Sequence, residues 1–268
     1  MFGMKSRRRR RIKERPFPPE WLAIVERNVP YYRTLPPEDQ KELQEHVQVF
    51  LAEKSFEGME GLEMTDEIRV TIAAQACVLL LHRETDYYPA LLSILVYPHH
   101  YFVQARIKLP DGTVSEGIDA RMGESWYRGQ VVLSWNDVLR GAADARDGDN
   151  VVFHEFAHQL DDEAGPHDGA PALPQRSMYI AWARVLSDEY QRLIDDIENH
   201  RPTDLRRYGA TSPAEFFAVA TEAFFEKPLA LKRRHRALYE QLALFYKQDP
   251  AGLEGSQPRA AVPHTTQA

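Results

Sequence analysis

The chain has 268 residues, 43% hydrophobic and 27% charged, a composition typical of folded proteins that argues against a wholly disordered one. Its formal net charge of -7 gives no overall reason to expect direct nucleic-acid binding. The single cysteine, Cys77, excludes an intrachain disulfide and a CxxC metal site, so a bound metal would need histidine and carboxylate ligands.

The two ends of the chain differ from its middle. Residues 7–11 are all arginine, and no apolar segment follows that could act as a secretion signal. The most hydrophobic run, residues 72–81, is too short to cross a bilayer. We therefore expect a cytoplasmic protein without a membrane span, in which residues 1–18 form a disordered basic arm. Residues 251–268 carry no core-forming pattern and are predicted to be a disordered tail.

The first third of the chain is predicted to be helical. One helix opens at Pro18 and runs to about Asn28, and another is predicted over residues 66–82. Between them, residues 36–39 start a helix whose apolar side chains recur at helical spacing, at Leu43, Val47, Phe50 and Leu51.

After residue 89 the pattern changes to short β-rich runs, followed again by helices. Strands are predicted at residues 94–97, 101–109 and 131–135, with turn signals between them, which indicates a small mixed or antiparallel sheet. Asp149 or Asn150 is placed to cap a helix that begins near Val151. Further helices are predicted around residues 179–197, 213–226 and 235–246. Residues 19–250 are thus expected to form a single domain, with a helical part over 19–90 and a catalytic core over 91–250.

The segment 151–162 carries the strongest chemical signal. It reads VVFHEFAHQLDD, in which His154 and His158 are four residues apart and so share one face of a helix, where both imidazoles can reach one metal ion. Glu155, next to the first histidine, is placed to act as a general base on a water at the metal. Two hydrogen-bonded core histidines, or a metal site without catalysis, are the alternatives.

A catalytic zinc ion usually has three protein ligands and one open position. No histidine follows His158 at the short spacing that would supply the third ligand. Glu215 and Glu222 are better candidates, because they lie two helical turns apart on one face among Phe and Ala, where a carboxylate needs a cation or strong donors. The spacing alone leaves both open. Asp161 or Asp162 could accept a hydrogen bond from a ligand imidazole.

The segments HEFAHQLD at 154–161 and YGATSPAEFFAVATEAFF at 208–225 resemble those of the Mlc titration factor A family of bacterial cytoplasmic zinc peptidases. They are also similar to the catalytic domain of lethal-factor-type toxins. The likeness extends upstream through residues 96–98 and 131–135. The resemblance implies an α+β fold: a zincin-like metallopeptidase core of the gluzincin type, with a small sheet, an active-site helix carrying HExxH and a mostly helical N-terminal part.

The resemblance also implies roles for individual residues. It places the metal-binding glutamate at Glu215, so one zinc ion would be held by His154, His158 and Glu215. It associates Tyr208 with the active site, where a phenol could donate to the oxyanion of a tetrahedral intermediate; a loop tyrosine packed at the surface is the alternative. Glu222 then becomes a supporting carboxylate that pairs with an arginine or with a ligand histidine.

The expected function is hydrolysis of peptide bonds in a peptide or protein substrate, with water activated by zinc and with Glu155 as general base. Aminopeptidase action is one form of it, and a sheet edge between residues 94 and 135 could bind an extended peptide by strand addition. The rival function implied by the resemblance is sequestration of a glucose-responsive DNA-binding repressor, with peptidase activity incidental or latent. Hydrolysis of a non-peptide amide is a third possibility.

Overall fold

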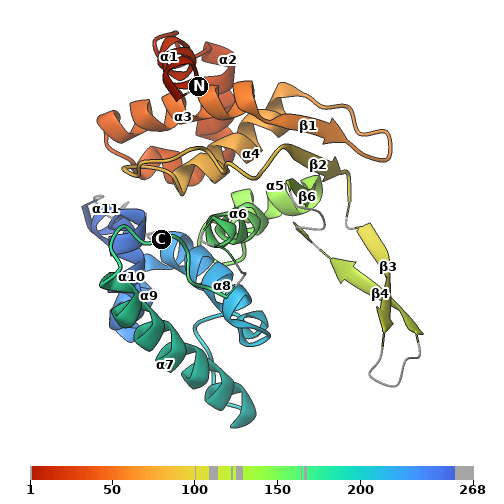
Figure 1. Cartoon of the computed structure of the whole chain (residues 1–268), viewed down its shortest axis with the longest axis vertical. Coiled ribbons are helices and arrows are strands. Elements are labelled where there is room, and N and C mark those ends of the chain that lie inside the picture. Colours follow the sequence, from red (N-terminus) through yellow and green to blue (C-terminus); the bar gives the residue numbers. More distant parts are fainter. Residues whose placement is uncertain are drawn as a thin grey trace, which may run out of the picture.

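The computed structural model describes residues 2–99, 101–108, 114–121, 123–124, 129–163, 165 and 168–256 of the chain. Most of them are helical, and one small sheet and a separate hairpin supply the strands, so the fold class is α+β (Figure 1). None of the helices among these residues is long and apolar enough to cross a membrane.

The N-terminal part is a layer of helices, as the sequence predicts. They are α1 (Phe2–Lys13), α2 (Pro19–Asn28), the 3-10 helix η1 (Pro30–Thr34), α3 (Pro37–Glu53) and α4 (Asp66–Val78). Proline at the first helical position starts α2 and α3, where its missing N–H costs nothing. Thr65 caps α4, its hydroxyl accepting from the backbone N–H of Ile68 at 3.4 Å.

Residues 2–13, which the charge pattern predicts to be part of a disordered arm, form helix α1. The reason is that one arginine of the run is paired rather than solvated. Arg9 donates to both carboxylate oxygens of Glu53 at 2.8 and 2.7 Å, and its guanidinium lies 2.6 Å from Asp86. Ile12 is buried in the core. A bidentate pair and one buried apolar side chain hold α1 against α3.

The sheet has three parallel strands and a short antiparallel edge. Its order is β1 (Ser55–Gly58), β2 (Ser93–Tyr97), β6 (Gln130–Ser134) and β5 (Gly123–Glu124). β2 pairs in parallel with β6 in the register Ile94–Val131, and β5 runs antiparallel to β6. The predicted small mixed sheet is therefore confirmed, although the sequence gives no sign of β1. Strands β3 (Tyr101–Lys108) and β4 (Val114–Arg121) form a separate antiparallel pair.

The rest of the chain is again helical. Its elements are α5 (Trp135–Ala143), α6 (Val151–Asp162), α7 (Met178–Glu198), the 3-10 helix η2 (Arg207–Ala210), α8 (Pro213–Glu226), α9 (Pro228–Arg234), α10 (Arg236–Tyr246) and α11 (Pro250–Ser256). Helix α11 occupies the start of the predicted tail, and residues 257–268 lie outside the described residues.

Helix α6 lies at the centre, between the N-terminal layer and α8 (Figure 1). Phe156 meets Phe50 of α3 and Tyr88 at ring-centroid distances of 5.7 and 4.9 Å. Phe153 meets Phe225 of α8 at 5.2 Å. These aromatic contacts bury α6 along nearly its whole length. The division into a helical part over 19–90 and a catalytic core over 91–250 stays a prediction. Strand β1, from the first part, pairs with β2, from the second.

Candidate metal centre

Local capping sets where the two helices of the site begin. The Asn150 side-chain oxygen accepts from the backbone N–H groups of Val152 and Phe153 at 3.1 and 3.0 Å, which starts α6 one turn before its first histidine. The Ser212 hydroxyl accepts from the backbone N–H of Glu215 at 3.2 Å and caps α8. Glu215 therefore lies in the first turn of α8.

Two histidines of α6 and one glutamate of α8 converge. His154 Nε2 lies 2.9 Å from Glu215 Oε2 and 3.3 Å from His158 Nε2, and His158 Nε2 lies 3.5 Å from Glu215 Oε2. Zinc bonds of about 2.0–2.1 Å in a tetrahedron would separate ligand atoms by roughly 3.3–3.4 Å. Two of the three separations are close to this value and the third is shorter, so the three side chains could hold a metal ion.

The tautomer of His154 favours the same conclusion. Its Nδ1 lies 2.7 Å from Glu222 Oε1, a carboxylate that can only accept when ionised, so Nδ1 carries the proton. Nε2 then faces Glu215 and His158. Two imidazole nitrogens and a carboxylate oxygen that face one point share a proton or hold a cation, and these groups are ligands that suit a divalent metal.

The ionisation of these groups reflects that convergence. Burial disfavours the charged form of His154, but hydrogen bonds to Glu215 and Glu222 outweigh it and raise the pKa to about 10. Burial would raise the pKa of Glu215, yet its hydrogen bonds to His154 and His158 hold that pKa well below its ordinary value. Burial raises the pKa of Glu155, which is 4% exposed.

Glu222 lies behind His154 and is fully buried. Its Oε1 accepts from His154 and from Arg206 Nη2, and its Oε2 accepts from the backbone N–H of Asn150 at 2.7 Å. The sequence predicts that this carboxylate pairs with an arginine or with a ligand histidine, and in the structure it contacts one of each. Arg206 also reaches Asp149 at 2.9 Å. No sequence pattern marks Arg206, because its partners are far from it along the chain.

Two further residues that the sequence predicts at the metal centre are Tyr208 and Asp161. Tyr208 is 53% exposed in η2, with its ring 5.9 Å from the ring of His154. Asp161 accepts from the backbone N–H of Gly169 at 2.9 Å and so braces the loop after α6.

One other group of described residues has metal-binding side chains close together: Asp39, Glu42 and His82. There the two carboxylates face different nitrogens of His82, at 3.2 and 3.3 Å, and so do not converge on one point of the ring.

The family described as glucose-regulated metallo-peptidase M90 matches residues 4–247. The chain is 44% identical to the uncharacterized protein slr2042 of Synechocystis sp., over 91% of this chain and 89% of that protein. It is 34% identical to the Mlc titration factor A of Serratia proteamaculans, over 81% and 84%. For the Mlc titration factor A of Klebsiella pneumoniae (strain 342) the identity is 32%, over 83% and 84%.

Proposed function

Because the chain belongs to the M90 family of glucose-regulated metallopeptidases, we propose that it is a zinc-dependent peptidase with a zincin-like core of the gluzincin type. In this proposal one zinc ion is held by His154, His158 and Glu215. The observation that carries it is the convergence of their three ligand atoms within 3.5 Å, in a family whose activity implies a metal. A zinc ion bound there supplies Lewis acidity, which polarises a scissile carbonyl and lowers the pKa of water.

The chain's own groups perform the proton transfers. Glu155 follows His154 directly on α6, and its buried carboxylate takes the proton of the attacking water and passes it to the leaving amine. The exposed phenol of Tyr208, whose ring lies 5.9 Å from the ring of His154, donates to the oxyanion that develops on the substrate. An extended peptide or protein substrate pairs with the sheet at the edge formed by β5 and β6.

A second function is favoured by the names of the relatives. Mlc titration factor A denotes proteins that titrate Mlc, and by analogy this chain would bind a DNA-binding repressor in the cytoplasm, with its peptidase activity incidental or latent. Both functions can share one protein, because the metal centre and an outer face of the chain need not overlap.

The deciding experiment measures zinc content and peptide cleavage side by side. Wild type should hold one zinc ion per chain and cleave, as tested with aminopeptidase substrates and internally quenched peptides. Glu155→Gln should keep zinc and lose turnover by a factor on the order of 10²–10⁴. Glu215→Ala should lose both. Glu198→Gln, an exposed glutamate at the end of α7, is the matched control and should behave as wild type.

Two outcomes would count against the proposal. Full activity in Glu155→Gln would show that Glu155 is not the general base. Zinc binding without cleavage by wild type, together with tight binding of purified Mlc, would favour the repressor-binding function instead.

A further inference from the structure

Helix α1 carries exposed arginines that the proposed peptidase function does not use. The helix lies at one end of the long axis of the molecule, on the outer side of the N-terminal layer (Figure 1). Its inner side is fixed to the rest of the fold by Arg9, which pairs with Glu53, and by the buried Ile12. The other arginines of the run are therefore held in a helical arrangement on the surface.

The outer face of α1 is a stripe of cations with one apolar side chain. Met4, Arg7, Arg8 and Arg11 follow one another at i, i+3, i+4 and i+7, so they share one face of the helix. All four are exposed, and so is Arg15 just beyond the helix. None of these four arginines forms an ion pair with a carboxylate in the part of the chain that the structure describes.

The surroundings of this face leave its charge uncompensated. Arg8 donates to the backbone carbonyl of Ala52 at 3.2 Å, which is not a counter-ion. Glu14 is the only acidic residue among residues 1–15, and it lies 3.8 Å from another arginine, Arg10. Outward-facing positive charge on a folded helix favours a negatively charged partner.

The charge of the whole chain is divided unevenly. Residues 1–15 hold eight basic side chains and one acidic side chain, a net charge of +7, whereas the whole chain carries -7. The rest of the chain therefore carries -14. An anionic surface attracts the α1 end of such a molecule and repels the remainder, so the contact is made by α1.

A bilayer with anionic lipid headgroups fits this face better than a nucleic acid does. Guanidinium groups bind phosphate through paired N–H donors in either partner. Met4 distinguishes the two, because it is 72% exposed on the same face as the arginines. An apolar side chain is stabilised below lipid headgroups, whereas a phosphate backbone offers it no apolar surface. Helices with arginines beside an exposed apolar side chain are typical of contacts with anionic bilayers.

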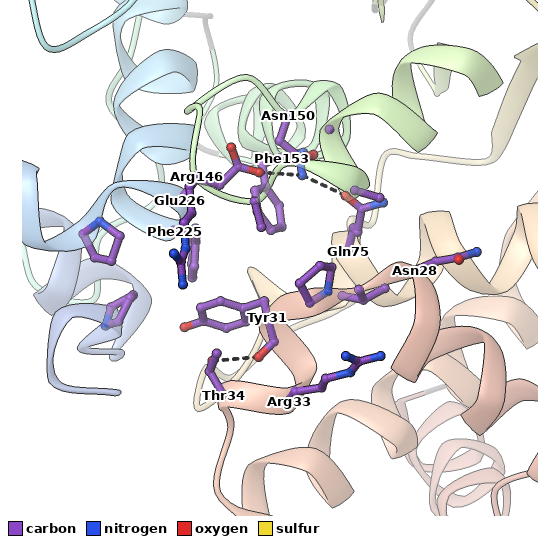
Figure 2. A pocket seen from close by; sticks show the side chains of 17 residues that line it. Asn28, Tyr31, Arg33, Thr34, Gln75, Arg146, Asn150, Phe153, Phe225 and Glu226 are labelled. Carbon is purple, nitrogen blue, oxygen red and sulfur yellow. Dashed lines mark hydrogen bonds between the residues drawn. The ribbon is translucent and has the colours of Figure 1, made fainter. Parts of the chain in front are cut away.

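Buried contacts join the N-terminal layer to the helices of the metal centre. Asn150, which caps α6, donates from Nδ2 to Gln75 Oε1 of α4 at 2.8 Å and to Glu226 Oε1 of α8 at 3.0 Å, as the dashed lines in Figure 2 show. These three residues line a pocket of about 240 Å³. At the same pocket Tyr31 of η1 packs against Phe225 of α8, with 5.5 Å between ring centroids.

We propose that the outer face of α1 binds the anionic headgroups of a lipid bilayer. Arg7, Arg8, Arg11 and Arg15 contact the lipid phosphates, and Met4 enters the region below them. The metal centre on α6 and α8 lies further along the long axis (Figure 1) and does not contact the lipid. Because buried hydrogen bonds join α4, α6 and α8, a bilayer that holds α1 also sets the orientation of the metal centre.

The test is flotation of the full chain with lipid vesicles. Wild type should float with vesicles of phosphatidylcholine and phosphatidylglycerol, mixed at about 2:1, and should not float with phosphatidylcholine alone. Raising the salt concentration from about 0.05 to 0.5 M should release it, because salt screens contacts between exposed charges. One arginine near an anionic surface changes affinity about fivefold, so the double variant Arg7→Gln, Arg11→Gln should bind about 25-fold more weakly.

Matched variants separate this face from a general loss of positive charge. The double variant Arg184→Gln, Arg233→Gln removes two exposed arginines from α7 and α9 and should bind as wild type. Met4→Ser should weaken binding severalfold without a change of charge. Because all these side chains are exposed, circular dichroism should show the wild-type fold in each variant.

The proposal is overturned if wild type floats equally with both kinds of vesicle or with neither, or if Arg7→Gln, Arg11→Gln binds as wild type. It is also overturned if a short DNA duplex binds more tightly than the vesicles and loses affinity in the same double variant but not in Met4→Ser, since the face would then recognise nucleic acid. Flotation does not involve peptide cleavage, so this result is independent of the proposed function.

Discussion

Replacing Glu222 by glutamine tests the support behind His154. The carboxylate is fully buried and accepts three hydrogen bonds, from His154 Nδ1, from Arg206 and from the backbone N–H of Asn150. Glutamine keeps the shape of the side chain but replaces one acceptor oxygen by an NH₂ group. At least one of the three donors then faces another donor.

The structure sets the size of the effect. One buried donor left unpaired costs about 1–3 kcal/mol, and Arg206 also loses a charged partner, although Asp149 remains 2.9 Å away. The free energy of unfolding should therefore fall by about 2–4 kcal/mol. A weaker acceptor on His154 Nδ1 makes Nε2 a poorer and less well oriented ligand, so zinc affinity should fall about 10- to 100-fold.

Zinc affinity is measured by competition with a chromophoric chelator, and stability by urea unfolding followed by circular dichroism. Glu226→Gln is the matched control, because Glu226 lies one turn further along α8, is also buried, and contacts Asn150 but not His154. It should keep the zinc affinity of wild type.

The reasoning is refuted if Glu222→Gln loses stability but binds zinc within about twofold of wild type, since the carboxylate would then be structural only. An equal loss of affinity in Glu226→Gln would show that any loosening of α8 has the same effect.

Three further predictions concern stability and reactivity. Burial raises the pKa of Glu226 to about 8, above its ordinary 4.5, so the stability that its protonated carboxyl contributes is full below about pH 4.5 and is lost as the pH rises toward 8. The free energy of unfolding of Glu226→Gln, measured with urea, should therefore rise by roughly 2–4 kcal/mol relative to that of wild type between pH 5 and 8.5. An unchanged difference over this pH range would contradict the burial argument. Arg9→Met should lower the free energy of unfolding by about 2–3 kcal/mol, because it breaks the bidentate pair with Glu53. Arg7→Met, at an exposed position of the same helix, is the control and should lower it by under about 0.5 kcal/mol. Equal effects of the two changes would mean that the pair with Glu53 does not hold α1 in place. Cys77 is fully buried and burial raises the pKa of its thiol, so it should react with Ellman's reagent only after unfolding; rapid labelling of the native protein would show that α4 opens.

The sequence by itself determined what depends on short separations along the chain. His154, Glu155 and His158 fall within five residues, and helical periodicity alone brings the two imidazoles to one face. Asn150 is recognisable as a possible cap for the same reason, since a cap acts within three residues. Helices α2, α3 and α8 follow from apolar spacing and from proline at their first turn.

Only the tertiary structure decided how distant segments meet. Glu215 and Glu222 share one face of α8, and which of them approaches His154 Nε2 depends on how α8 is rotated and shifted against α6. Spacing leaves that choice open, and a resemblance had to supply it. Gln75, Arg206 and Glu226 have ordinary sequence surroundings, and their part in the network comes from packing between helices. Even the arginine run became a helix because Glu53 and Asp86, more than 40 residues away, lie where Arg9 can reach them. A buried carboxylate or guanidinium needs a partner of opposite charge or a hydrogen-bond partner, and the fold decides which residue lies close enough to be that partner.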